Sequence, residues 1–200
     1  MTAPRVVLAS ASAIRATVLR QAGVAIEVIP ADVDESALKQ SMRAERASAA
    51  DCATALAILK AQRVSQRQPG ALVIGADQML ECDGTWFDKP GDTAQAIGQL
   101  RALRGKTHQL IAAVVAVRDG EVLWRHVELA RLTVRPFSDA FLESYLSAVG
   151  AAVCQSVGAY QLEGRGVQLF SHIDGDHFTI LGLPLLPLLD FLRRQAVMLA

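Results

Sequence analysis

The sequence predicts a single α/β domain over residues 1–200, in which a β-sheet is flanked by helices. Three observations support this prediction. Short apolar runs bounded by turn residues alternate along the chain with alanine-rich segments of helical spacing. A chain of 200 residues is long enough to bury one sizeable core. With 52% hydrophobic and 20% charged residues, the composition is that of a globular protein and not of a disordered one.

Charge balance and cysteine usage argue against several classes of protein. Twenty basic residues balance twenty acidic ones, so no bulk positive field would recruit nucleic acid or a membrane, and any anion site must be local. Cys52, Cys82 and Cys154 are odd in number and far apart, which argues against a disulfide framework. The early apolar run is too short for an export signal, and residues 178–189 are too short to span a membrane. We therefore expect a soluble, cytoplasmic protein.

The first predicted element is a strand over residues 5–9, followed by a helix. Ser12 suits the N-cap of that helix, and Gly23 stands where a helix ends in a left-handed residue. Ser10, Ser12 and Arg15 then lie at a strand-to-helix turn, where backbone amides, the helix dipole and the guanidinium can hold an anion. An ordinary capped helix with a surface arginine explains the same residues.

A second strand is predicted over residues 24–29, and an acidic segment, residues 32–36, follows it. Its carboxylates could hold a divalent cation, form a solvated loop or begin the next helix. We expect that helix over residues 44–66, with Lys60 on its inward-facing stripe. A lysine in this position either extends its ammonium group outward or meets a buried anion.

The stretch over residues 71–90 is the strongest candidate for a ligand site. Residues 71–74 form an apolar run that predicts a buried strand, and Asp77 and Gln78 follow at its end, where open α/β sheets form their ligand sites. A tight turn then reverses the chain, and Lys89 brings an ammonium group back towards the same region. A hairpin in which Asp77 merely caps a turn is the alternative.

The rest of the chain again alternates helices with strands. We expect helices over residues 94–103, 140–148 and 185–194, a hairpin of residues 109–117 and 121–134, and a strand over residues 167–173. The glycine-rich residues 158–166 lack the GxGxxG and Walker spacings, which excludes those nucleotide-binding motifs. The four histidines show no metal-ligand pattern, and we expect them to be strand or loop residues.

Taken in order, these motifs resemble the Maf family of nucleotide pyrophosphatases, historically called septum formation inhibitors. The matching segments are Leu8–Arg15, Asp34–Glu35, Ala57–Ala61, Gly75–Gln78, Lys89–Pro90, Leu103–His108, Gly158–Gly164 and Gly182–Leu185. Each motif alone is weak, whereas the ordered series is specific and nearly full length. The chain departs from the family at Ala13, which replaces a proline, and at Ile14, which replaces an arginine or tryptophan.

The resemblance implies hydrolysis of a nucleoside triphosphate to the monophosphate and pyrophosphate, a reaction catalysed mostly by positioning and electrostatic stabilisation. Asp77 would be the catalytic base, and Glu35 with Asp77 would hold a divalent cation, Mg²⁺ or Mn²⁺. The phosphate-binding residues would be Arg15, Lys60 and Lys89, helped by the backbone near Ser10 and Ser12. The fold implied is a curved mixed sheet with a cleft between two lobes, similar to the inosine triphosphate pyrophosphatases, and a homodimer is plausible.

Base specificity is implied at Ile14, Gln78 and Glu163. Gln78 and Glu163 match the family branch that prefers 7-methyl-GTP, whereas Ile14 matches neither this branch nor the pyrimidine-preferring one. Four alternatives stay open: a pyrophosphatase of the dTTP/UTP type, a non-catalytic nucleotide-binding regulator of cell division, a degenerate member that turns over slowly, and a hydrolase of another class that releases orthophosphate.

Overall fold

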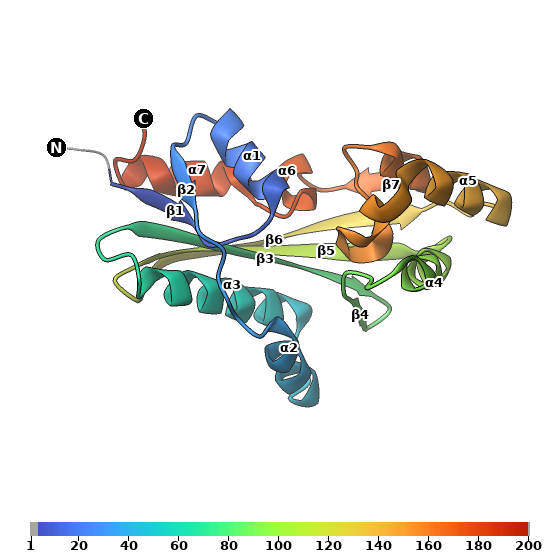
Figure 1. Cartoon of the computed structure of the whole chain (residues 1–200), viewed down its shortest axis with the longest axis horizontal. Coiled ribbons are helices and arrows are strands. Elements are labelled where there is room, and N and C mark those ends of the chain that lie inside the picture. Colours follow the sequence, from blue (N-terminus) through green and yellow to red (C-terminus); the bar gives the residue numbers. More distant parts are fainter. Residues whose placement is uncertain (1–3, 200) are drawn as a thin grey trace. The chain divides into compact units, whose positions relative to one another are not determined.

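The computed structural model describes residues 4–199, and these residues form two compact units. Unit 1 comprises the residues up to Gln78, Ile111–Glu128 and the residues from Asp176 onward, and unit 2 comprises Met79–Leu110 and Leu129–Gly175. The strands follow the order β2-β1-β3-β5-β6-β7, with β4 paired to β3 (Figure 1). Parallel and antiparallel pairs both occur, so the predicted mixed sheet flanked by helices is confirmed. Its curvature and the cleft between lobes stay predictions.

Three long strands contribute residues to both units, and the shorter elements belong to one unit each. The long strands are β3 (Leu72–Cys82), β5 (Thr107–Arg118) and β6 (Glu121–Val134). Unit 1 also contains β1 (Val6–Leu8), α1 (Ala13–Gln21), β2 (Ile26–Val28), α2 (Glu35–Ala44), α3 (Ala49–Ser65), α6 (His177–Ile180) and α7 (Leu185–Arg194). Unit 2 contains β4 (Thr85–Phe87), α4 (Thr93–Leu103), α5 (Asp139–Val149) and β7 (Phe170–Asp174).

Most of these elements lie where the sequence places them, and the caps explain why. Ser12 accepts a hydrogen bond from the amide of Arg15 at the start of α1, and Gly23 ends that turn with a φ of 80°. Asp92 and Ser138 cap α4 and α5 in the same way. Cys82 and Cys154 are free thiols. Within residues 4–199, no helix combines the length and the apolar character that crossing a membrane requires.

The helix expected over residues 44–66 is present as α3, but it begins at Ala49 and not at residue 44, and a separate helix, α2, precedes it. Ser48 provides the physical reason, since its hydroxyl accepts the amide of Asp51 and starts a new helix. Asp34 caps α2, and hydrogen bonds from the amide of Ala37 and the hydroxyl of Ser36 lower the pKa of its carboxyl. The acidic segment is therefore the beginning of a helix, one of the three alternatives.

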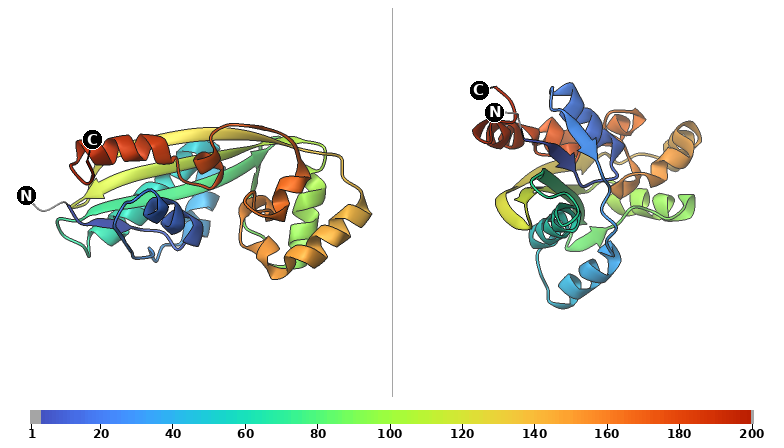
Figure 2. Two further views of the ribbon diagram at one scale, coloured as in Figure 1. Left: turned by 90° about the horizontal axis from the view of Figure 1, so that it is seen from above. Right: turned by 60° about the vertical axis from the view of Figure 1, so that its left-hand side comes forward.

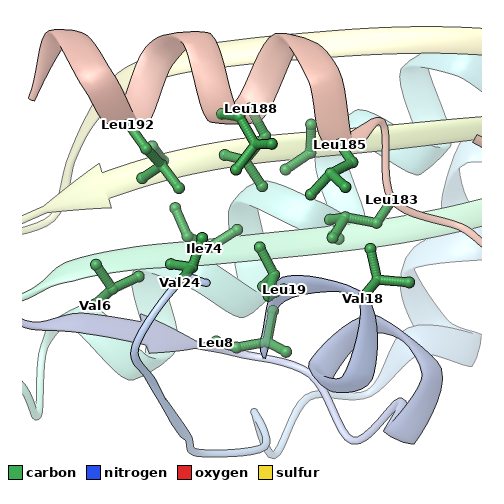
Figure 3. Packing of buried hydrophobic residues seen from close by; sticks show 14 of the residues in the cluster. Val6, Leu8, Val18, Leu19, Val24, Ile74, Leu183, Leu185, Leu188 and Leu192 are labelled. Carbon is green, nitrogen blue, oxygen red and sulfur yellow. The ribbon is translucent and has the colours of Figure 1, made fainter. Parts of the chain in front are cut away.

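Unit 1 packs its helices on both faces of the sheet. α1 and α7 cover one face of β3 and α3 covers the other (Figures 1 and 2). Leu19, Ile74 and Leu188 are fully buried in the layer between α1, β3 and α7 (Figure 3). Burying a leucine of this kind contributes about 1.5–3 kcal/mol, so this layer anchors the strands that carry the polar residues described below.

Gly75 allows α3 to lie directly against β3. A Cβ atom at Gly75 would stand 2.2 Å from the carbonyl oxygen of Ala57 and 2.8 Å from the Cβ of Ala61. We expect Gly75→Ala to lower the free energy of unfolding by about 1–3 kcal/mol, because a methyl group there forces the helix away. Urea denaturation would measure the loss. Gly98→Ala in α4 is the control, because a Cβ atom at Gly98 would have no atom within 4 Å, and this substitution is expected to stabilise the chain slightly. Equal effects of the two substitutions on the free energy of unfolding would contradict the packing argument.

Asp77 lies within a strand and not at its end, which corrects the sequence-based expectation. The parallel pairing between β1 and β3 does finish at Leu8 and Ile74. However, β3 continues to Cys82 and pairs with β4 on the far side of a turn at Asp83 and Gly84. Gly75 and Ala76 look like a break in sequence, but small residues are compatible with an extended strand when a helix packs closely against it.

Unit 2 encloses a buried polar pair, His108 and Tyr160. A ring nitrogen of His108 lies 2.6 Å from the Tyr160 hydroxyl, and its Nδ1 has no hydrogen-bond partner among the described residues. Burial lowers the pKa of His108 to about 4 and raises that of Tyr160, so both side chains are neutral near pH 7. Tyr145 packs nearby through a hydrogen bond to the carbonyl of Ala159.

We expect His108 to make folding acid-sensitive. The pKa of His108 falls from 6.5 in the unfolded chain to about 4 in the folded one, so below pH 6.5 the unfolded state binds the extra proton. Stability is therefore complete above pH 6.5 and falls by up to about 3 kcal/mol as the pH drops towards 4. Urea denaturation between pH 4.5 and 7 would show this slope in the parent chain and in the exposed control His172→Gln, but not in His108→Gln. A slope that persists in His108→Gln would assign it to other groups.

Candidate active site

The alternation of β3 aims Asp77 at α3. Residues 73, 75 and 77 share one face of a strand, so the close approach of α3 at Gly75 also brings the helix beside Asp77. Lys60 belongs to the same helix, and its Nζ lies 2.5 Å from Oδ1 of Asp77. Both side chains are buried, with 9% and 7% of their surfaces exposed. Lys60 thus meets a buried anion, which was one of the two outcomes expected for it.

Glu35 adds a second carboxylate to Lys60. Its Oε1 lies 2.8 Å from Nζ, and 45% of its side chain is exposed. Because Glu35 is the first residue of α2, the Asp34 cap fixes the backbone that carries it. The ammonium of Lys60 therefore bridges one buried carboxylate and one half-exposed carboxylate.

The second carboxylate oxygen of Asp77 is the unusual feature of this site. Oδ2 is buried and has no hydrogen-bond partner among the described residues. An unsatisfied buried carboxylate oxygen carries a desolvation cost of several kcal/mol in most proteins, so its presence calls for a physical explanation. A water molecule, a cation or a substrate group that reaches Oδ2 would satisfy it.

Arg15 contacts the backbone next to Asp77 and holds three segments together. Its Nε donates to the carbonyl of Gly182 at 2.8 Å, and its Nη1 donates to the carbonyl of Ala76 at 2.8 Å and to Oγ of Ser10 at 3.2 Å. Burial lowers the pKa of Arg15, and the charges of Asp77 and Glu35 oppose that change. Arg15 thus fixes the backbone immediately before Asp77, and among the described part of the chain no hydrogen bond of its Nη2 group is seen, so Nη2 can donate to a ligand.

Gln78 is oriented by the end of α6. Its Nε2 donates to the carbonyls of Thr179 and Ile180, each at 3.0 Å, so the amide orientation is fixed and Oε1 remains as an acceptor. Neither α6 nor this use of its carbonyls was predicted from the sequence. Two residues could have indicated this short helix. Asp176 caps its start by accepting a hydrogen bond from the amide of Thr179, and Gly182 follows its end with a φ of 87°.

Comparison with known proteins places these residues in a family. The sequence matches the family described as Maf-like protein over residues 5–195. The chain belongs to this family. The Maf resemblance predicted from the motifs is thereby confirmed.

Maf relatives resemble this chain over nearly their whole length. A protein of Paramagnetospirillum magneticum named nucleoside triphosphate pyrophosphatase is 62% identical over 94% of this chain and 97% of its own. A protein of Mesorhizobium japonicum named 7-methyl-GTP pyrophosphatase is 51% identical over 94% of this chain and 95% of its own. A solved dITP/XTP pyrophosphatase from Mycobacterium abscessus is 18% identical, with a TM-score of 0.38 over 66% of this chain and 75% of its own.

The remaining residues expected from the Maf motifs fall into two groups. Ser10, Ser12 and Ile14 lie in unit 1, where Ser10 is buried and accepts the amide of Ser12 at 3.3 Å. Lys89 follows β4 and Glu163 lies in a turn, both exposed and both in unit 2. The structure therefore brings together Lys60, Asp77 and Glu35 directly and joins Ser10 to Arg15. The roles of Lys89, Glu163 and Ile14 stay predictions.

Proposed function

We propose that this chain hydrolyses a nucleoside triphosphate to the monophosphate and pyrophosphate, with Asp77 as the group that orients and deprotonates the attacking water. The buried Oδ2 of Asp77 carries the proposal, because no residue within 4–199 hydrogen-bonds to it while Lys60 holds Oδ1. A carboxylate fixed in this way can accept a proton from a water at one defined position. Homologous proteins named nucleoside triphosphate pyrophosphatase support the assignment.

The cations of unit 1 would hold the phosphates. An ammonium group has three N–H donors, and two of those of Lys60 face Asp77 and Glu35, which leaves one for a phosphate oxygen. Arg15 offers Nη2, and the first-turn amides of α1 near Ser10 and Ser12 add the partial positive charge of a helix N-terminus. These donors would stabilise charge that builds on the leaving pyrophosphate, and Lys89 is proposed for the same task.

The charge balance of the site favours a divalent cation. Lys60 and Arg15 are already balanced by Asp77 and Glu35, so a triphosphate would add uncompensated negative charge. Asp77 and Glu35 fit a hard cation through oxygen ligands, because Mg²⁺ commonly takes one or two carboxylates and completes its shell with phosphates and water. A bound Mg²⁺ or Mn²⁺ would neutralise part of the negative charge of the phosphates. The described residues contain no cluster of three or more metal-ligating side chains, which agrees with a cation that is shared with the substrate.

We propose 7-methyl-GTP as the preferred substrate, with a pyrimidine triphosphate such as dTTP or UTP as the alternative. The fixed Oε1 of Gln78 can accept a hydrogen bond from an N–H donor of guanine, and equally from the N3–H group of uracil or thymine. The relatives named 7-methyl-GTP pyrophosphatase, at 51% identity, agree with the guanine base. We propose Glu163 and Ile14 as further base-contacting residues, within a chain that acts as one domain over residues 1–200.

A product-release assay tests both the reaction and the base. The chain would be incubated with 7-methyl-GTP, GTP, dTTP, UTP and CTP in the presence of Mg²⁺ or Mn²⁺, and pyrophosphate would be measured against orthophosphate. We expect metal-dependent release of pyrophosphate, fastest from 7-methyl-GTP. Release of orthophosphate would indicate another class of hydrolase. Binding without any release would indicate a regulator or a degenerate member of the family.

A further inference from the structure

Two motif segments that have no role in the proposed reaction meet in unit 2. They are Leu103–His108 and Gly158–Gly164. His108 of β5 and Tyr160 are 52 residues apart, and a ring nitrogen of His108 lies 2.6 Å from the Tyr160 hydroxyl. The two residues are buried, with 0% and 5% of their surfaces exposed. A hydrogen bond buried in this way fastens the segment that carries Tyr160 to a strand of the sheet.

Tyr160 and Phe170 close the two ends of a loop that carries Glu163. Their rings pack edge to face with centroids 4.8 Å apart, and the His108 ring centroid lies 5.6 Å from one and 6.0 Å from the other. Between these ends, residues 161–169 form a turn and a short 3₁₀ helix. A surface loop of about 6–16 residues whose ends meet is an Ω-loop, a type that frequently carries functional residues.

The backbone of the 161–169 loop braces its own interior. The amide of Gly164 donates to the carbonyl of Gln161 at 3.2 Å. Gly166 packs on the same peptide, since a Cβ atom there would stand 2.4 Å from the carbonyl oxygen of Gln161. Glu163 is exposed and lies between these contacts. The position of its backbone is therefore set by the position of the ends of the loop.

The first end of the loop follows a backbone conformation that needs support. Ala159 is fully buried and has a φ of 62°, a left-handed value that residues other than glycine rarely adopt. Such a conformation persists only where the surrounding structure holds it. The hydroxyl of Tyr145 donates to the Ala159 carbonyl at 3.2 Å, and the hydrogen bond between Tyr160 and His108 holds the next residue. Without the Tyr160 hydroxyl, this backbone can relax and shift the loop.

We propose that His108 and Tyr160 are positioning residues that hold Glu163 in place for contact with the base of the nucleoside triphosphate. Because the contact of Glu163 with the base belongs to the proposed function, this role rests on that function. A carboxylate only accepts hydrogen bonds, and guanine presents two adjacent N–H donors, at N1 and N2, along one edge. Uracil and thymine present a single N–H group between two carbonyl oxygens. A carboxylate held at one position therefore selects guanine nucleotides, whereas a mobile carboxylate loses this selection.

Steady-state kinetics of pyrophosphate release from 7-methyl-GTP and from UTP test this positioning role. Tyr160→Phe keeps the ring against Phe170 and removes only the hydroxyl. We expect its KM for 7-methyl-GTP to rise about tenfold, while kcat and the KM for UTP stay within about twofold of the parent values. His108→Leu removes the same hydrogen bond from the other side and should reproduce the effect. Thr133→Val is the control, because it deletes an exposed hydroxyl that contacts Thr107 in the same unit, and its KM values should not change.

A double-mutant cycle with Glu163→Gln decides whether Tyr160 acts through Glu163. Glutamine replaces one carboxylate oxygen with an NH₂ donor, so Glu163→Gln alone should raise the KM for 7-methyl-GTP at least about tenfold. Adding Tyr160→Phe should then cause no further increase, because the carboxylate that Tyr160 positions is already gone. Effects that multiply would show that the Tyr160 hydroxyl acts elsewhere and would overturn the proposal. An unchanged KM in either single variant would overturn it as well.

Limited proteolysis of the full chain by trypsin follows the loop independently of activity. Arg165 is exposed in the loop and Arg101 is exposed on α4 of the same unit, so cleavage after Arg101 reports opening of the unit as a whole. We expect Tyr160→Phe to speed cleavage after Arg165 at least about threefold and to leave cleavage after Arg101 unchanged, because cleavage follows local opening. An equal increase at both sites, or no increase at Arg165, would overturn the positioning role.

The parent chain separates the two levels of the proposal. A parent that releases no pyrophosphate would overturn the proposed function and the selection of the base together. An active parent whose KM for 7-methyl-GTP and whose cleavage after Arg165 are insensitive to Tyr160→Phe would overturn the positioning role alone and leave the proposed function in place.

Discussion

Replacing Asp77 with asparagine is expected to lower kcat for pyrophosphate release by about 10²–10⁴-fold while the chain stays folded. The asparagine oxygen can still accept the hydrogen bond that Lys60 gives to Oδ1, and Glu35 still faces the ammonium. However, an amide NH₂ group can replace Oδ2, and it cannot take a proton from water. The loss should therefore appear in kcat more than in KM, because Arg15 and Lys60, the proposed phosphate-binding residues, are unchanged.

Asp83→Asn is a matched control for this substitution. Asp83 lies in an exposed turn with a φ of 51°, a conformation that asparagine tolerates well. The Asp83→Asn substitution removes one carboxylate from the chain and leaves the residues of the candidate site unchanged, so kcat should not change. Near-parental turnover in Asp77→Asn would remove Asp77 from the role of base. A loss of activity that accompanies a loss of circular dichroism signal would show instead that Asp77 supports the fold.

Local signals carried most of the fold prediction. Ser12, Asp92 and Ser138 were identified as caps because an N-cap depends on residues within one turn of each other. The start of α3 was placed at residue 44 and not at Ala49 because the chain around Ser48 is rich in alanine and charged residues, which favour helix by propensity alone. The continuation of β3 past Gly75 was missed because the packing of α3 decides it.

In the site, too, features set by nearby residues could be predicted, whereas contacts between residues far apart in the sequence could not. Lys60 and Asp77 are 17 residues apart, and the helical stripe could indicate only that Lys60 points inward, not which anion it meets. Gln78 contacts carbonyls 101 and 102 residues away, and Arg15 reaches Gly182 across 167 residues. No periodicity in the sequence reports such pairs. The family motifs indicated that these positions belong together, and the structure supplied the contacts between them.

Replacing Lys60 with methionine is expected to lower the free energy of unfolding by about 3–5 kcal/mol, because it leaves the Asp77 carboxylate buried without its counter-charge. Methionine fills a similar volume, so the effect is not caused by a cavity. Pyrophosphate release should fall as well, since Lys60 holds Asp77 and faces the proposed phosphate site. Urea denaturation gives the first quantity. Lys106→Met is the control, because the exposed bridge from Lys106 to Asp83 should contribute little.

The double variant Lys60→Met/Asp77→Leu separates stability from function. Replacing both members of a buried ion pair with apolar groups of similar size is often neutral or stabilising, so the double variant should regain most of the stability lost by Lys60→Met alone and should remain inactive. A double variant that is less stable than Lys60→Met would show that the pair itself holds α3 to β3. Recovery of stability without activity would instead mean that the close packing at Gly75 already fixes the helix, and that the buried charges of Lys60 and Asp77 are kept for catalysis.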